Sequence, residues 1–297
     1  MDTLADAEGR IAVACGVSPV AYAVEIPDVS LRARVLECGS GPAIVLLPDL
    51  GMAASTWLPL MAELDGHRVI AVDLPGFGQA GPMDYRTVSD LREFAVAYVH
   101  GLLSVLGLDT VTLAGNGVGG LWALWTAADR AERVRTVALL GAPACTAGTS
   151  VSKLRRVGWQ GHLWPRLGHP TVPGGWAELA HAVQAQPGYT TAFRTLARAV
   201  AASGGFGATD LGRLAQPVCL LLGERDPLAR LDTLGTIADV IGGPAIFAGS
   251  TGHLPWLDNA SATAEVLRAY AVTSPPIPAP RSGARSADSA GTPRPPG

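Results

Sequence analysis

The chain has 297 residues, of which 48% are hydrophobic and 16% charged, and its formal net charge is −3. This composition is typical of a folded domain with a sizeable core, and it excludes a disordered chain or a basic polypeptide that coats nucleic acid. No stretch approaches the ~18–20 continuous apolar residues of a membrane span. The first ten residues carry acidic side chains, where a secretory signal would need a basic start and an apolar run. We therefore expect a soluble cytoplasmic protein with no nucleic-acid or membrane partner.

Short apolar runs alternate with helical patterns along most of the chain. The runs that predict strands are Ala21–Ile26, Leu31–Cys38, Ala43–Leu47, Arg68–Asp73, Thr110–Gly115, Val134–Gly141, Pro217–Gly223 and Pro244–Ala248. The first two are expected to be antiparallel, and the continuous apolar character of most later runs is typical of parallel strands that are covered on both faces. This order predicts an α/β fold, with a mostly parallel sheet and helices on both faces.

Apolar residues at helical spacing predict the helices that cover the sheet. The clearest pattern begins at Leu91 after Ser89 and Asp90, either of which can cap the helix N-terminus. Similar patterns predict helices over Thr56–Leu64, Val118–Ala128, Thr233–Ile241 and Ala260–Ala271.

Residues 146–214 interrupt this alternation with helical pieces and Gly/Pro breaks. The segment is too long for a simple crossover between two strands, so we expect a helical lid or cap. Residues 1–145 and 215–272 are then expected to form the core of the fold, and residues 273–297, rich in Pro, Ser and Arg, a disordered tail.

Tryptophans are frequent in and around the predicted cap. Trp159 and Trp164 lie within it, and Trp57 and Trp256 lie near other motifs of the expected pocket. A tryptophan-rich cap over an apolar cleft would enclose a large hydrophobic substrate, and aromatic packing is the alternative interpretation.

The densest glycine cluster follows a predicted strand and runs directly into a predicted helix, as Gly115-Asn116-Gly117-Val118-Gly119-Gly120. These glycines satisfy the GxGxxG pattern of dinucleotide sites, but such a site needs the motif in an opening βαβ unit and an acidic residue at the end of the next strand. Here earlier α/β units precede the motif, and the next strand ends in Leu139-Leu140-Gly141-Ala142-Pro143. We therefore expect no cofactor.

The same turn resembles the GxSxG elbow of the α/β-hydrolase fold superfamily, with Gly117 at the position of the serine nucleophile. Five further motifs match in the superfamily's order. They are the opening hairpin Leu31–Leu47, the oxyanion loop at Pro48-Asp49-Leu50-Gly51, the DxPGxG stretch at Ala71–Gly78, and the acid and histidine loops at Leu221–Pro227 and Gly249–His253. The resemblance covers nearly the whole chain before the tail, and it implies an α/β-hydrolase fold with an inserted cap.

The resemblance also implies roles for particular residues. His253 corresponds to the catalytic base, and Asp226 corresponds to the acid that orients it. Gly117 has no side chain to form a covalent intermediate. Glycine there also removes the ~1–3 kcal/mol of backbone strain that the elbow imposes on other residues.

The oxyanion donors of the superfamily correspond to the backbone N–H of Val118 and, if the loop keeps its path, that of Leu50. Asp49 replaces the usual glycine of this loop and is expected near Gly117. It is either an acid in the reaction or a solvated loop residue.

These matches predict an enzyme that lacks the nucleophile and uses a His253/Asp226 pair and an oxyanion hole in non-covalent acid–base chemistry. The expected substrate is a hydrophobic, carbonyl-bearing metabolite, and the expected step is a cyclisation, elimination, isomerisation or other lyase-type reaction in natural-product biosynthesis.

Two alternatives are a catalytically silent member that binds a small molecule or a protein, and an esterase or lactonase whose nucleophile has moved. No metal is expected, because the four cysteines form no CxxC pair and the cap histidines lack a ligand spacing. We expect a monomer or a homodimer.

Overall fold

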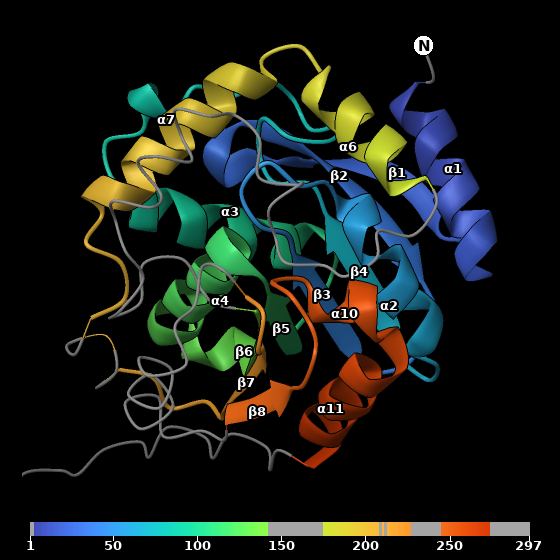
Figure 1. The fold of residues 1–297 in the computed structure, drawn as a ribbon. Helices are drawn as coiled ribbons and strands as arrows, with labels where there is room; N and C mark the ends of the chain where they lie inside the picture. The colour runs from blue at the N-terminus through green and yellow to red at the C-terminus, as the bar shows by residue number, and fades with distance from the viewer. Residues whose placement is uncertain (1–2, 142–174, 208–209, 211–212, 227–244, 274–297) are drawn as a thin grey trace, which may run out of the picture.

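The computed structural model describes residues 3–141, 175–207, 210, 213–226 and 245–273. Within these ranges an eight-stranded sheet has the order β1-β2-β4-β3-β5-β6-β7-β8 (Figure 1). β2 pairs antiparallel with β1 and β4, and every other neighbouring pair is parallel. The mostly parallel α/β architecture that the sequence predicts is confirmed.

Each predicted strand is present, with ends that shift by at most one residue. The strands are β1 (Val20–Ile26), β2 (Leu31–Cys38), β3 (Ala43–Leu47), β4 (Arg68–Val72), β5 (Val111–Gly115), β6 (Val134–Leu140), β7 (Val218–Gly223) and β8 (Ala245–Ala248). The side chains of β3, β5 and β6 are almost entirely buried. Burial on both faces explains why these strands read as continuous apolar runs.

Two groups of helices cover the two faces of the sheet (Figure 1). α3 (Leu91–Val105) and α4 (Gly117–Asp129) form one group, and α2 (Leu58–Glu63), α10 (Pro255–Asp258) and α11 (Ala260–Thr273) form the other. Asp90 is the cap of α3, because its side chain accepts the Glu93 N–H. The predicted helix Thr233–Ile241 lies outside the described residues.

Short 3-10 turns connect several of these elements. They are η1 (Pro27–Val29), η2 (Ala54–Trp57), η3 (Tyr85–Thr87) and η4 (Ala131–Arg133). The predicted helix Thr56–Leu64 is divided, because η2 ends at Trp57 and α2 begins at Leu58 with Pro59 in its first turn. Proline is tolerated there because the first N–H groups of a helix have no intrahelical partner.

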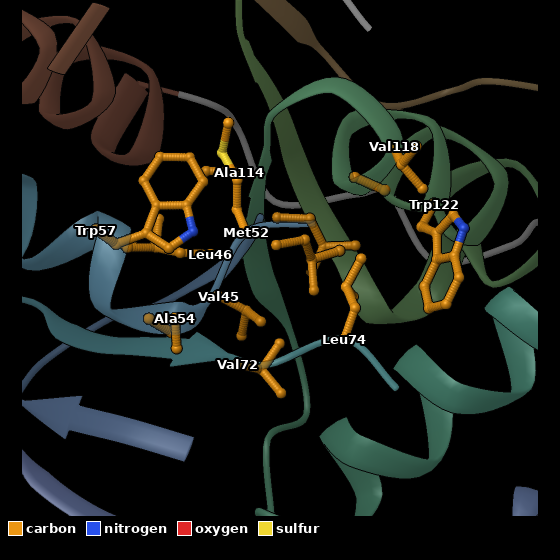
Figure 2. Close-up of a cluster of buried hydrophobic side chains, with 14 of the residues drawn as sticks. Val45, Leu46, Met52, Ala54, Trp57, Val72, Leu74, Ala114, Val118 and Trp122 are labelled. Carbon is orange, nitrogen blue, oxygen red and sulfur yellow. The ribbon is translucent and has the colours of Figure 1, made fainter. Parts of the chain in front are cut away.

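Apolar side chains from β3, β4 and β5 interdigitate with residues of η2 and α4 (Figure 2). Val45 and Leu46 of β3, Val72 of β4, and Trp57 and Trp122 from the covering elements are all completely buried. Burial of each such large side chain stabilises the fold by about 1.5–3 kcal/mol. This core fixes the ends of the strands, and the candidate site is built on those ends.

The sequence patterns above do not predict helix α1 (Leu4–Cys15). A capping box between Thr3 and Asp6 starts the helix, and Gly16, with a φ of 69°, ends it. Glu8 of α1 forms a buried ion pair with Arg34 of β2. The helix packs against α2 and against α6 (Trp176–Gln184), so tertiary contacts stabilise an element whose own apolar stripe is short.

Asp73, at the end of β4, is a completely buried structural residue. Its carboxylate accepts the Ala54 N–H at 2.6 Å and the Gln79 N–H at 2.8 Å. Burial raises the pKa of Asp73 to about 6, although the nearby Arg34 lowers it. These hydrogen bonds tie the start of η2 to the DxPGxG turn, which supports the loop after β3.

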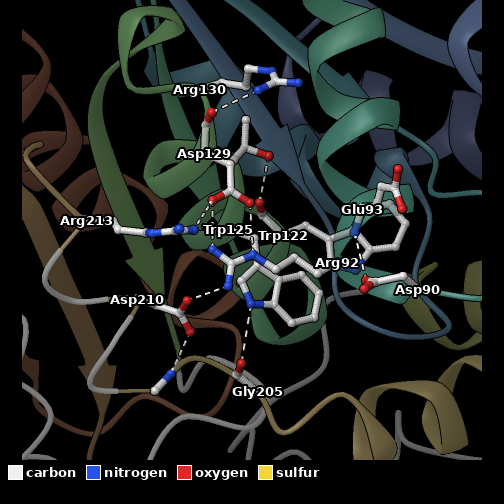
Figure 3. A network of polar contacts seen from close by, with 12 residues as sticks. Asp90, Arg92, Glu93, Trp122, Trp125, Asp129, Arg130, Gly205, Asp210 and Arg213 are labelled. Atoms are coloured by element: carbon white, nitrogen blue, oxygen red, sulfur yellow. Dashed lines mark hydrogen bonds and ion pairs between the residues drawn. The ribbon is translucent and has the colours of Figure 1, made fainter.

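Two helices, α6 and α7 (Tyr189–Ala202), lie within the predicted cap segment 146–214. Arg92 of α3 pairs with Asp129 of α4 at 2.8 Å and with Asp210 beyond α7 (Figure 3). The Trp125 indole N–H also donates to the Gly205 carbonyl at 3.4 Å. The segment after α7, which contains Gly205 and Asp210, is therefore bonded to α3 and α4.

Part of the predicted cap and almost all of the predicted tail lie outside the described residues. Trp159 and Trp164 lie outside the described residues, and so does the predicted tail 273–297, except for Thr273 at the end of α11. The division into core, cap and tail stays a prediction.

Candidate functional site

The elbow between β5 and α4 is tight because two backbones meet there. β5 ends at Gly115, α4 begins at Gly117, and Gly117 has a φ of 50° in the left-handed region. A Cβ on Gly115 would come within 2.5 Å of the Gly119 backbone, and a Cβ on Gly119 would overlap the Leu47 carbonyl. Close backbone packing therefore accounts for the glycine cluster without a dinucleotide.

Asp49 lies in the turn that follows β3, and its carboxylate occupies the space that a side chain on Gly117 would need. A Cβ on Gly117 would overlap the carboxylate oxygens of Asp49. The Val118 N–H donates to Asp49 Oδ1 at 2.6 Å. Asp49 is 4% exposed, so it is a buried residue and not a solvated loop residue.

The turn around Asp49 is closed by its own backbone. The Met52 N–H donates to the Asp49 carbonyl at 3.1 Å, and Gly51 has a φ of 80°. Leu50, a predicted oxyanion donor through its backbone, lies in this turn with a buried side chain. A left-handed residue at the third position of such a turn favours glycine, which explains Gly51.

His253 lies between two carboxylates and is completely buried. Its Nδ1 is 2.8 Å from Asp226 Oδ2, and its Nε2 is 3.2 Å from Asp49 Oδ2. Asp226 follows β7 in a turn closed by its N–H to the Gly223 carbonyl at 3.1 Å. The structure thus brings together the three predicted catalytic residues at the carboxyl ends of the parallel strands.

Asn116 holds the histidine loop in place and was missed by the sequence reasoning. Its side-chain amide donates to the His253 carbonyl at 3.0 Å and also to the Leu140 carbonyl. The available signal was a polar residue at an otherwise apolar strand-to-helix junction. Because one amide joins the end of β6 to the loop of His253, Asn116 positions the imidazole through the His253 backbone.

The charge of His253 follows from its neighbours. Burial alone would lower the pKa of His253, but Asp226 and Asp49 outweigh burial and raise that pKa to about 10. At neutral pH the ring is therefore an imidazolium, with one N–H toward each carboxylate. With both carboxylates ionised, the three groups carry one net negative charge.

The raised pKa of His253 predicts a loss of stability in alkali. Its folded pKa of about 10 exceeds the ordinary 6.5, so its contribution is complete below pH 6.5 and is lost as the pH rises toward 10. We expect the free energy of unfolding to fall by up to about 1 kcal/mol per pH unit in this window because of this group. Urea denaturation from pH 6.5 to 9.5 measures the slope. His253→Gln is expected to show a smaller slope, and equal slopes would contradict the assigned charge.

The expected oxyanion hole differs from the observed arrangement. The Val118 N–H is not open to a substrate oxygen, because Asp49 Oδ1 already accepts it. The reason is the absence of a side chain on Gly117, which leaves room for the Asp49 carboxylate to reach the start of α4.

Trp57 and Trp256 stack on each other, with ring centroids 3.8 Å apart and an interplanar angle of 23°. Each is at most 1% exposed, and the Trp256 indole N–H donates to the Thr56 carbonyl at 2.7 Å. This contact packs η2 against the helix that follows the His253 loop. It accounts for both rings as core packing, the alternative interpretation given above.

The arrangement of the site disfavours a metal ion. The imidazole separates Asp49 from Asp226, so the two carboxylates cannot converge on one cation. Across the described ranges, no group of three or more His, Cys, Asp or Glu residues is placed to hold a metal.

In the same part of the chain, no helix is both long and apolar enough to cross a bilayer.

A strand–elbow–helix turn with a buried His–Asp pair at the carboxyl edge of a parallel sheet defines an α/β-hydrolase class of protein. The model of the alpha/beta hydrolase family matches residues 44–266, so the chain belongs to that family.

Two curated relatives illustrate the similarity. The chain is 34% identical over 123 residues to a 2-hydroxy-6-oxononadienedioate/2-hydroxy-6-oxononatrienedioate hydrolase of Dechloromonas aromatica, covering 38% of this chain and 41% of that protein. It is 33% identical over 119 residues to a haloalkane dehalogenase of Agrobacterium fabrum, covering 40% and 38%. The chain thus spans about two fifths of the length of these relatives, which are enzymes by name.

Solved structures match over most of the chain. A carboxylesterase from Bacillus subtilis has a TM-score of 0.74 at 19% identity and covers 90% of this chain and 96% of its own. A 2-hydroxy-6-oxo-6-phenylhexa-2,4-dienoate hydrolase from Rhodococcus has a TM-score of 0.69 at 23% identity and covers 85% and 99%. At these identities the similarity shows the fold alone.

Proposed function

We propose that the chain is an enzyme in which Asp49 and His253 transfer protons on a hydrophobic, carbonyl-bearing metabolite without a covalent intermediate. The observation that supports this proposal is the Asp49 carboxylate in the space next to Gly117, bonded to the Val118 N–H and His253 Nε2. A lyase-type step, an isomerisation or a cyclisation in natural-product biosynthesis would follow from such proton transfer.

Asp49 has the chemistry of a general base. Each of its oxygens accepts one hydrogen bond from the groups named above, and a carboxylate oxygen has a second lone pair that remains for a substrate proton. In the proposed step, the C–H bond next to the substrate carbonyl breaks and its proton moves to Asp49. The electron pair moves onto the carbonyl oxygen to give an enolate, which then expels a leaving group or takes a proton at another carbon.

His253 and Asp226 support this transfer. The imidazolium places a positive charge beside the Asp49 carboxylate and donates a hydrogen bond to it through Nε2. Asp226 fixes the ring orientation at Nδ1 and is a positioning residue in this scheme.

The contact at His253 Nε2 favours proton transfer over acyl transfer. A relocated serine or cysteine would need a hydrogen bond to His253 Nε2 to be activated. That nitrogen is already bonded to Asp49 Oδ2 at 3.2 Å. This arrangement counts against the alternative of an esterase or lactonase with a relocated nucleophile.

The catalytically silent alternative is also less favoured. A buried imidazolium between two buried carboxylates has a large desolvation cost. A pocket that only binds an apolar ligand gains nothing from this arrangement. The relatives named above also support a carbonyl-bearing substrate, because the hydrolases among them are named for oxo acids.

Covalent trapping tests the proposal. The protein is incubated separately with 4-nitrophenyl butyrate and with a fluorophosphonate, and adducts are mapped by peptide mass. We expect no adduct at Asp49 or at a pocket serine. A butyryl group on Asp49 that is lost in Asp49→Asn would establish the nucleophilic alternative, and a phosphonylated serine would establish a relocated serine.

A further inference from the structure

A buried tyrosine hydroxyl lies against the turn that carries Asp49. Tyr189 is the first residue of α7, and its Oη is 2.6 Å from the position of a Cβ on Gly51. Gly51 is two residues after Asp49 in the same turn. Tyr189 is 3% exposed, so helix α7 brings a polar group into the interior directly over the candidate site loop.

The ring of Tyr189 is fixed by aromatic neighbours. It meets Phe77 edge to face at 5.8 Å and 76°, and it lies 5.8 Å from Phe193 at 32°. Phe193, one helical turn further along α7, also contacts the Gly51 position at 2.8 Å. The Tyr189 hydroxyl therefore has a defined position, because its ring is packed among aromatic side chains.

The Tyr189 hydroxyl has no hydrogen-bond partner within the described residues. The other completely buried tyrosines differ: Tyr85 donates to the Pro75 carbonyl at 2.9 Å, and Tyr98 donates to the Asp73 carbonyl at 2.8 Å. Burial raises the pKa of Tyr189, so the hydroxyl keeps its proton. Buried polar groups are normally paired, and the place of this unpaired donor over the Asp49 turn makes it available to a ligand bound there.

We propose that Tyr189 is a substrate-binding residue that donates a hydrogen bond to the oxygen of a neutral carbonyl compound bound beside the Asp49 turn. The proposal rests on the proposed function. The Val118 N–H is already engaged by Asp49, so a substrate oxygen needs another donor, and Tyr189 lies over the same turn. A neutral ligand fits because the Asp49–His253–Asp226 group carries net negative charge, and an apolar one fits the walls of Phe77 and Phe193.

The stability of Tyr189→Phe tests whether the hydroxyl has a structural role. The variant keeps the ring and removes an unpaired donor, so we expect its Tm to equal or exceed that of the wild type. Tyr85→Phe is the matched control, because it removes a hydroxyl that is paired with a backbone carbonyl, and its Tm is expected to fall. An equal fall in Tyr189→Phe would overturn the proposal.

Ligand binding tests the recognition itself. Acetophenone and ethylbenzene share a ring and a two-carbon chain and differ by the carbonyl oxygen. We expect the wild type to bind acetophenone about five- to tenfold more tightly in calorimetric titrations, and Tyr189→Phe to bind both alike. No preference in the wild type, or an unchanged preference in the variant, would contradict the role.

The binding result is independent of the proposed chemistry. Equilibrium binding requires no proton transfer, so Asp49→Asn is expected to keep the preference for acetophenone. If Asp49 is not a base, this preference survives while proton exchange fails. If Tyr189 is not a donor, the preference is absent and proton exchange is unaffected.

Discussion

Gly117→Ser alone is expected to destabilise the protein by about 2–6 kcal/mol, the sum of left-handed backbone strain and overpacking at ~1–3 kcal/mol each. Gly117 has a φ of 50°, and its new Cβ would overlap the Asp49 carboxylate. Urea denaturation measures the loss. A Gly117→Ser variant as stable as the wild type would show that Asp49 does not occupy this space.

A second substitution is expected to relieve the overlap and to create an activity. In Gly117→Ser/Asp49→Gly the carboxylate is absent, the Val118 N–H is free, and the new serine hydroxyl lies near His253 Nε2. We expect this double variant to regain most of the lost stability and to hydrolyse 4-nitrophenyl acetate. Asp49→Gly alone is the matched control and is expected to stay inactive on this ester. A double variant that remains as unstable as Gly117→Ser would show that overlap with the Asp49 carboxylate is not what destabilises a side chain at position 117.

Asp226→Asn is expected to reduce proton transfer by up to about 10²–10⁴-fold, the contribution of general acid–base catalysis, because Asp49 depends on the imidazolium that Asp226 orients. The neutral amide no longer holds the imidazolium at Nδ1, so the charge that supports Asp49 weakens. Deuterium uptake into the methyl group of acetophenone in D2O measures the effect. Asp84→Asn is the control, because Asp84 pairs with the exposed Arg86 two residues further on, and it is expected to keep full activity. A rate in Asp226→Asn within twofold of the control would remove Asp226 from the scheme.

The sheet was predictable from sequence because its strands are buried on both faces. Strands such as β3 and β6 read as continuous apolar runs, and the order of motifs then fixed the fold class. Helix α1 was not predictable in this way. Its buried residues gain their burial from α2 and α6, which are distant in sequence, and its ion pair with Arg34 exists only after the chain has folded.

The candidate site was predictable in part. The motifs place His253 and Asp226 on loops that must meet at one edge of the sheet, and the structure brings them to 2.8 Å. The position of the Asp49 carboxylate depends on the turn at Gly51 and on the missing side chain at Gly117. The two departures from the superfamily pattern compensate each other in volume. Gly117 lacks the serine side chain, and the carboxylate of Asp49, which replaces a glycine, fills the space that this side chain would take.

Tyr189 carries no signal in its local sequence. Its contacts with Gly51 and Phe77 join segments that are more than a hundred residues apart, and whether its hydroxyl is paired depends on the packing of α7. Asn116 is similar, because its partners lie at the ends of β6 and in the loop after β8. Such residues follow from tertiary geometry and not from a motif.

Deuterium exchange at the methyl carbon of acetophenone in D2O, compared between the wild type and Asp49→Asn, tests the role of the displaced carboxylate most directly. Asparagine keeps the shape of the side chain and removes its basicity. We expect the wild type to exchange faster than buffer and Asp49→Asn to fall at least about 100-fold toward the buffer rate. Equal rates in the two proteins, or a wild type no faster than buffer, would contradict Asp49 as the base.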